Sequence, residues 1–137
     1  MWAGVSVMSK NLEVSVLFDF YGEMLTEKQK DVIDLYYNED LSLAEIAEHE
    51  GISRQGVRDN IKRGEVFLYE LEDKIGYVRQ YRATEKLLDE LQQVNQQLYM
   101  VNEKYVYNNE IRLLSEKLDQ MMESYRNEND PKPEEER

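Results

Sequence analysis

The sequence predicts an all-α fold on three observations. Both prolines, Pro131 and Pro133, lie near the C-terminus, so no proline interrupts a helix before them. Apolar residues recur at steps of three and four along most of the chain, which is the spacing of one helical face. Thr26 and Ser42 are each followed three residues later by Gln or Glu, a pattern that marks helix starts. We therefore expect a helical bundle followed by long amphipathic helices.

The first part of the chain predicts two helices joined by a capped turn. The first helix spans about 11–25, where the apolar residues share one face. Thr26 caps the second helix and forms a capping box with Gln29. Residues 38–40 read as a polar turn that ends this second helix.

Two further helices are expected directly after that turn. Ser42 opens a short third helix, and Gly51 ends it because glycine tolerates a positive φ angle. Ser53 caps the fourth helix. Gly64 costs about 1 kcal/mol relative to alanine in a helix, so we expect a bend or a boundary there.

From Val66 onward the pattern is long and amphipathic. Heptad steps of four and three connect Leu87, Leu91, Val94, Leu98, Val101 and Tyr105, and then Ile111, Leu114, Leu118, Met121 and Tyr125. The two sets are out of phase across 106–109. We favour a helical hairpin that turns at Asn108 and Asn109, and the alternative is one continuous helix, or coiled coil, that absorbs the phase break.

Composition and charge limit the function. The 137 residues contain no Cys and one His, which excludes disulfides and thiolate metal sites and disfavours zinc and triad chemistry. No apolar run could span a bilayer, and no phosphate loop or nucleophile elbow occurs. We therefore expect no enzymatic activity, no cofactor or metal, no membrane insertion and a cytoplasmic location. The net charge of −12 argues against a protein that simply coats nucleic acid.

Residues 43–63 nevertheless show the spacing of a helix-turn-helix. Ala47 is the small residue needed where two helices cross, and Gly51 follows four positions later in the turn. Apolar anchors stand before, within and after the turn, at Ile46, Ile52, Val57 and Ile61. All these requirements are met in register, so the second helix of the motif is the candidate recognition helix.

The candidate nucleic-acid-binding residues lie on that second helix: Ser53, Arg54, Gln55, Arg58, Lys62 and Arg63. Residues at the start of a recognition helix reach base edges, where Arg forks onto guanine and Gln onto adenine. Lys62 and Arg63 are better placed for phosphate. Asp59 would repel phosphate unless it accepts from a cytosine amine or pairs with Arg58 or Lys62. The alternative interpretation is that the fold is retained for protein contacts.

The chain accordingly divides into four expected segments. They are a flexible extension at 1–10, a helix-turn-helix domain at 11–76, a long amphipathic helical segment at 77–126 and a disordered acidic tail at 127–137.

Four runs of the sequence are distinctive: LFDFY at 17–21, LTEKQ at 25–29, DLSLAEIAE at 40–48 and ISRQGVRDNIKR at 52–63. In these runs the chain resembles the YlxM-like (UPF0122) family of small bacterial helix-turn-helix proteins. The same stretch is similar to promoter-recognising region 4 of sigma factors. The chain departs from sigma factors in lacking their other regions, and from a typical YlxM-like chain in its longer C-terminal part.

The first resemblance implies a bacterial cytoplasmic accessory or regulatory factor of the signal recognition particle. Such a factor would bind the particle RNA, its GTPase, or both. The second resemblance implies DNA recognition, and a DNA-binding regulator would form a homodimer through the C-terminal helices. A protein-interaction module that has lost nucleic-acid binding is the third hypothesis.

Overall fold

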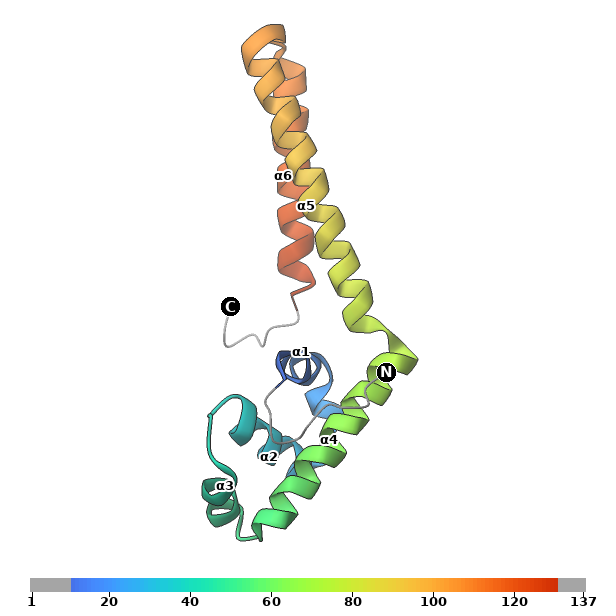
Figure 1. Cartoon of the computed structure of the whole chain (residues 1–137). Coiled ribbons are helices and arrows are strands. Elements are labelled where there is room, and N and C mark those ends of the chain that lie inside the picture. The colour runs from blue at the N-terminus through green and yellow to red at the C-terminus, as the bar shows by residue number, and fades with distance from the viewer. Residues whose placement is uncertain (1–10, 131–137) are drawn as a thin grey trace. The chain divides into compact units, whose positions relative to one another are not determined.

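The structure is a computed structural model that describes residues 11–130, and every regular element among them is a helix (Figure 1). The expected all-α fold class is therefore confirmed for these residues. The elements are α1 (Leu12–Tyr21), η1 (Gly22–Met24), α2 (Glu27–Tyr37), α3 (Leu43–Glu50), α4 (Arg54–Ile75), α5 (Tyr77–Val101), η2 (Asn102–Val106) and α6 (Asn109–Glu128). No helix in this described range is long and apolar enough to cross a membrane.

The chain forms two compact units, one up to Val78 and one from Arg79 onward. The extension expected to be flexible, 1–10, lies outside the described residues, as does the predicted tail from 131. The tail was expected to begin at 127, but α6 continues to Glu128. There the N–H of Asn129 still closes a helical turn onto the carbonyl of Tyr125.

Helices α2, α3 and α4 begin at the predicted N-cap residues. The Thr26 hydroxyl accepts from the Gln29 N–H at 3.2 Å, and the Gln29 side chain accepts from the Thr26 N–H at 3.4 Å. The first helix is shorter than predicted and ends at Tyr21. Its expected last turn tightens into η1, where the Leu25 N–H bonds to the Gly22 carbonyl at 3.1 Å.

Helix α4 organises the first unit because it contacts both halves of its core. Leu68 and Tyr69 belong to a cluster with α1 residues, including Val14 and Leu17. Earlier on the same helix, Val57 and Ile61 join a second cluster, which contains Val32, Tyr36 and Ile46 from α2 and α3. One continuous helix therefore ties the helix-turn-helix to the rest of the bundle.

The helix boundary considered at Gly64 does not occur, since α4 continues as one helix from Arg54 to Ile75. Gly64 is buried, and a Cβ atom built there would overlap Cδ1 of Ile33 on α2. The glycine is therefore explained by the close approach of two helices, an effect that helix propensity alone does not contain.

A buried carboxyl group lies one residue further on. Glu65 is only 4% exposed and accepts a short hydrogen bond from the Tyr37 hydroxyl of α2. Burial raises the pKa of Glu65, an effect that the hydrogen bond from Tyr37 partly offsets. Burial and the neighbouring Glu65 also raise the pKa of Tyr37.

The end of α4 is fixed by a second polar network. Gly76 ends the helix at a φ of 67°. One Glu72 carboxylate oxygen accepts from the Tyr21 hydroxyl at 2.7 Å and from the Val78 N–H at 3.1 Å. The Tyr77 N–H in turn donates to the Tyr21 hydroxyl oxygen at 3.1 Å. These bonds satisfy backbone groups that a helix start leaves without partners.

The second unit is a helical hairpin, which was the favoured expectation (Figure 1). The chain reverses after η2, where Tyr107 has a φ of 57° and its N–H bonds to the Asn102 carbonyl at 2.7 Å. The Asn102 side chain bonds to both the N–H and the carbonyl of Asn108, and the Asn108 side chain caps α6. The phase break in the heptads therefore marks a turn closed by asparagines.

The close packing at Gly64 predicts that Gly64→Ala destabilises the protein by about 1–3 kcal/mol, because overpacking outweighs the propensity of alanine. Urea unfolding measures this cost. Removing Cδ1 from the opposite side chain with Ile33→Val should make Gly64→Ala less costly. A Gly64→Ala protein that is more stable than the parent would contradict the packing argument.

Glu65 predicts a pH dependence of stability. Its folded pKa is raised above the unfolded value, so its stabilising contribution is present at acid pH and is lost as pH rises through the folded pKa. Glu65→Gln keeps an oxygen for Tyr37 without the buried charge. We expect this variant to exceed the parent in unfolding free energy at alkaline pH, by a margin that narrows as the pH falls through the folded pKa of Glu65. If the difference in unfolding free energy between variant and parent increased on acidification, the pKa of Glu65 would be shifted in the opposite direction.

Candidate nucleic-acid interface

The helix-turn-helix forms at the predicted residues. Helix α3 ends at Gly51, whose φ and ψ angles of 67° and 33° are left-handed, and α4 begins three residues later. The Ile52 N–H reaches back to the Ala47 carbonyl at 3.1 Å and tightens the turn. Of the expected anchors, Ile46, Val57 and Ile61 are fully buried, and Ile52 is half-buried against the same cluster.

Side-chain caps hold both helices of the motif. The Ser42 hydroxyl accepts from the Glu45 N–H at 3.1 Å, and the Glu45 side chain accepts from the Ser42 N–H at 3.3 Å. The Ser53 hydroxyl accepts from the Gly56 N–H at 3.0 Å. Ser53, a candidate binding residue, thus also has a structural role at the start of α4.

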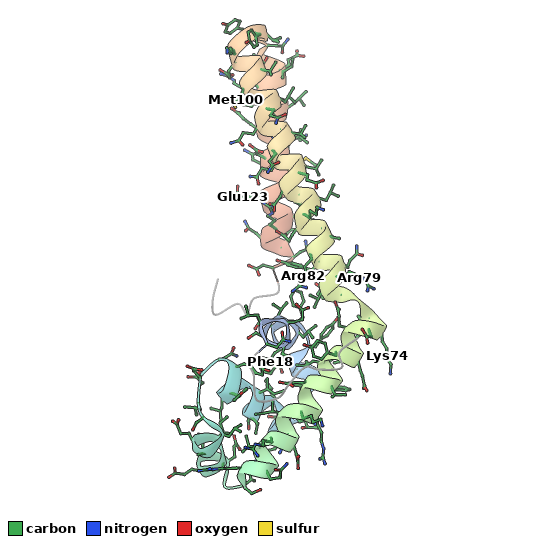
Figure 2. The ribbon with its side chains drawn as sticks, in the orientation of Figure 1. Phe18, Lys74, Arg79, Arg82, Met100 and Glu123 are labelled. Carbon is green, nitrogen blue, oxygen red and sulfur yellow. The ribbon has the colours of Figure 1, made fainter. Side chains whose placement is uncertain are left out.

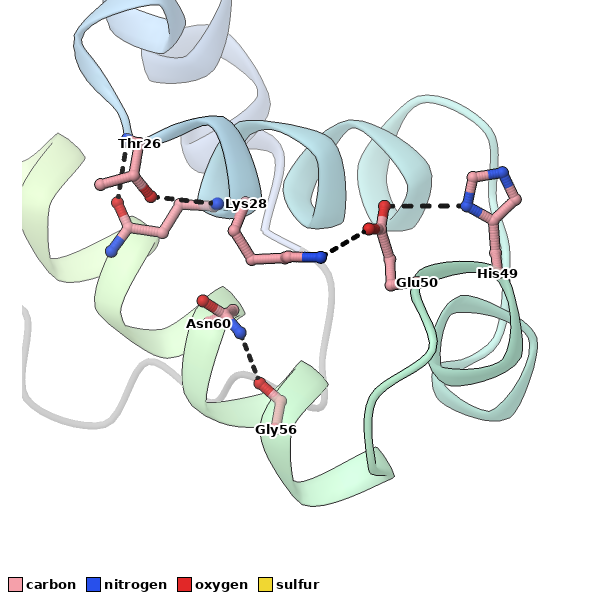
Figure 3. Close-up of polar contacts among 7 residues, drawn as sticks. Thr26, Lys28, His49, Glu50, Gly56 and Asn60 are labelled. Atoms are coloured by element: carbon pink, nitrogen blue, oxygen red, sulfur yellow. Dashed lines mark hydrogen bonds and ion pairs between the residues drawn. The ribbon is translucent and has the colours of Figure 1, made fainter.

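Polar contacts connect the motif to the preceding helix (Figure 3). The Lys28 ammonium on α2 lies 3.0 Å from a Glu50 carboxylate oxygen at the end of α3. The other carboxylate oxygen is 3.7 Å from Nδ1 of His49. The Asn60 amide donates to the Gly56 carbonyl at 2.8 Å, so this side chain is occupied within α4. The charged groups in these contacts belong to α2 and α3, and none of the contacts involves a cationic side chain of α4.

All six candidate residues have exposed side chains: Ser53, Arg54, Gln55, Arg58, Lys62 and Arg63. Arg54, Arg58 and Lys62 are four residues apart, so they share one face of α4. Within 11–130, no carboxylate lies within 4 Å of the four cationic groups. The structure therefore brings the predicted cations together on one solvent-facing helix.

Asp59 is bound by a neighbour on its own helix. It forms no ion pair with Arg58 or Lys62 among the described residues, and instead accepts a hydrogen bond from the Gln55 amide at 3.0 Å. The reason is geometric, since Gln55 lies one turn before Asp59 on the same face. Gln55 would have to leave Asp59 before its amide could fork onto an adenine.

An open groove of about 620 Å³, which was not predicted from the sequence, adjoins the last two cations, Lys62 and Arg63. Its walls include Lys62, Arg63, Val66 and Phe67 of α4, and Met24 lies on its other side. Val66 and Phe67 are separated from the end of the cationic stretch by two residues, and this apolar pair was the signal available in the sequence. Their exposure depends on how α2 and η1 pack, so the sequence could not reveal it.

Comparison with known proteins identifies the family. Residues 8–105 match the model of the family described as "Putative helix-turn-helix protein, YlxM / p13 like". The chain is 52% identical over 87 residues to a UPF0122 protein of Acetivibrio thermocellus, which covers 60% of this chain and 74% of that protein. It is 43% identical over 97 residues to a UPF0122 protein of Bacillus thuringiensis, which covers 71% and 88% respectively. The chain therefore belongs to the UPF0122 family of YlxM / p13 like helix-turn-helix proteins.

Proposed function

We propose that this protein is an accessory or regulatory factor of the signal recognition particle pathway and contacts nucleic acid through α4. The observation that carries the proposal is the cationic face of α4. In a chain with a net charge of −12, four exposed cations gather on the second helix of a helix-turn-helix. Such a face matches the phosphate backbone of nucleic acid and provides the positive charge that binding requires.

The residues of this face have different proposed roles. Arg54 and Gln55 lie in the first turn of α4, from which side chains of this motif reach base edges. Lys62 and Arg63 lie two turns later and would bind phosphate, while Arg58 lies between the two groups. Ser53 would donate a hydroxyl hydrogen bond to phosphate while its oxygen caps the helix.

The proposed partners are the particle RNA and the particle GTPase, in the cytoplasm. This part of the proposal rests on the family resemblance, because the α4 face by itself fits DNA as well as RNA. The groove beside Lys62 and Arg63 offers apolar side chains for a protein partner next to the cationic face. Nucleic acid and GTPase could then bind at adjacent parts of the same domain.

A DNA-binding regulator is the second candidate function. The observation that favours it is the hairpin of α5 and α6, whose heptad pattern suits a dimer that would present two recognition helices. A regulator should protect discrete DNA sequences, whereas a particle factor should recover one RNA together with its GTPase. Capture of the tagged protein from its own lysate, with and without nuclease, separates these outcomes.

The double variant Arg54→Ala with Arg58→Ala tests the cationic face. We expect it to lower affinity for the captured nucleic acid by at least about 1–3 kcal/mol and to relax its sequence preference, because Arg54 is proposed to reach a base edge and Arg58 lies beside it. Unfolding free energy should change by less than about 0.5 kcal/mol, since both side chains are exposed.

A matched control removes the same charge elsewhere. Lys74→Ala with Lys86→Ala deletes two exposed cations outside the proposed face and should leave binding unchanged. Equal loss of affinity in both double variants would mean that net charge, and not the α4 face, governs binding. Unchanged affinity in the Arg54 and Arg58 variant would remove the proposed role of this face.

A further inference from the structure

The hairpin has a polar seam where its two helices meet. The Asn95 amide donates to the Ser115 carbonyl and to the Asp119 carboxylate, each at 2.8 Å, and the Ser115 hydroxyl donates to the Asn95 side-chain oxygen at 2.8 Å. Asn95, Asn102 and Ser115 are all at most 4% exposed. Leu88 and Met122 are the buried apolar residues of this unit. The interior of the hairpin therefore uses few of its apolar side chains.

Charged side chains form ion pairs along one flank of this seam. The Arg126 guanidinium on α6 lies 2.6 Å from the Asp89 carboxylate and 3.4 Å from the Glu85 carboxylate on α5. It also donates to the Gln92 side chain at 3.1 Å. Asp119, which follows the same flank of α6, bonds to Asn95 as described above. The charged side chains named here therefore already have partners inside the hairpin.

The opposite flank is apolar and exposed. With the buried residues Leu88, Asn95 and Asn102 at heptad position a, the exposed apolar residues of α5 fall at d and g. These residues are Leu87, Leu91, Val94, Leu98, Val101 and Tyr105. With Ser115 and Met122 at position a of α6, its exposed d and g residues are Leu114, Leu118, Met121 and Tyr125. In an antiparallel pair the g positions of both helices lie on the same side, so these residues form one surface, the apolar flank.

The size of the apolar flank points to a partner. Its side chains are between 44% and 66% exposed, which amounts to roughly 600 Å² of apolar surface when a full Tyr side chain contributes about 200 Å² and a full Leu, Val or Met side chain about 60–120 Å². A monomer rarely leaves more than a few hundred Å² of contiguous apolar surface in water. Two such flanks facing each other would bury about 1,200 Å² in total, which is where the range of specific, stable interfaces begins.

We propose that the apolar flank binds the same flank of a second copy, so that two hairpins form an antiparallel four-helix bundle. Apolar residues at a, d and g make the wide stripe that a bundle helix buries, instead of the narrow a and d seam of an isolated pair. A two-fold axis along the bundle would place α5 of each copy beside α6 of the other. This inference deepens the dimer named for the second candidate function by assigning its interface and orientation, and it does not depend on which nucleic acid is bound.

Charges at the rim of the flank are complementary in this arrangement. Position c borders position g on the outside, and it carries Glu90 and Lys104 on α5, and Glu110 and Lys117 on α6, all exposed. Because Asn95 is level with Ser115 and the helices are antiparallel, Glu90 lies within three residues of the level of Lys117, about 4.5 Å along the axis. By the same count Lys104 lies within four residues of Glu110, about 6 Å. Each acidic side chain would therefore face a basic one across the two-fold axis.

The α6 half of the flank lies beyond residue 105, where the match to the family model ends. The family description consequently does not cover the surface that completes the proposed bundle, and the inference concerns this chain itself.

The test is the mass of the full-length protein in solution, measured by sedimentation equilibrium across the micromolar range after nuclease treatment. We expect twice the chain mass of 16.4 kDa. Leu114→Glu, on the apolar flank, should weaken self-association at least tenfold. Leu113→Glu introduces the same charge at a neighbouring residue that faces away from the flank and is similarly exposed (53% against 61%), and it should remain dimeric.

Two outcomes would overturn the proposal. One is a parent protein that is monomeric throughout this range, which would assign the flank to a different partner. The other is an equal loss of self-association in Leu114→Glu and Leu113→Glu. Circular dichroism of Leu114→Glu checks that the hairpin still forms, as expected for a side chain that the seam does not bury.

The relative orientation of the copies has its own test. Lys117→Glu should weaken the dimer by placing a like charge opposite Glu90, and Glu90→Lys in the same chain should restore it. Failure of the second change to restore self-association would contradict the two-fold arrangement. The Arg54→Ala with Arg58→Ala variant should remain dimeric, so loss of nucleic-acid binding and loss of the dimer can be told apart.

Discussion

The close approach of α2 and α4 at Gly64 is the contact on which the first unit depends. The position of Ile33 against the α4 backbone leaves no room for a Cβ atom. Ile61 and Leu68, on either side of this crossing, belong to the two separate core clusters. Because interiors are close-packed, a change of one methyl group at the crossing affects both clusters. The same helix carries the cationic face, so the crossing also fixes where that face is presented.

Burial and charge are separated along α4. Its buried side holds apolar residues together with Glu65, which is tolerated because Tyr37 donates to it and because burial favours its neutral form. Its exposed side holds Arg54, Arg58 and Lys62 without carboxylate partners among the described residues. An acidic protein can in this way keep a local positive surface, since the interaction of exposed charges is screened beyond about 10 Å in salt.

The interior of the hairpin differs from that of the first unit in containing several polar side chains. Its seam contains hydrogen bonds of asparagine and serine, whose directionality favours one pairing of the two helices. Its apolar side chains lie mostly beside the seam and remain exposed. Buried apolar area is the main source of folding free energy, so covering the apolar flank, as in the proposed bundle, would add to the stability of the hairpin.

The sequence by itself determined the local features: the three N-caps, the left-handed turn at Gly51, the anchors of the helix-turn-helix and the reversal near Asn108. Each depends on residues within about one turn of one another, so spacing alone encodes it. Only the tertiary structure decided the role of Gly64, the bond from Gln55 to Asp59, and the exposure of the heptad residues. The heptad pattern shows that apolar residues share a face. Whether that face packs inside the hairpin or beside its seam depends on which side chains fill the interior, and here two asparagines and a serine fill it together with Leu88 and Met122.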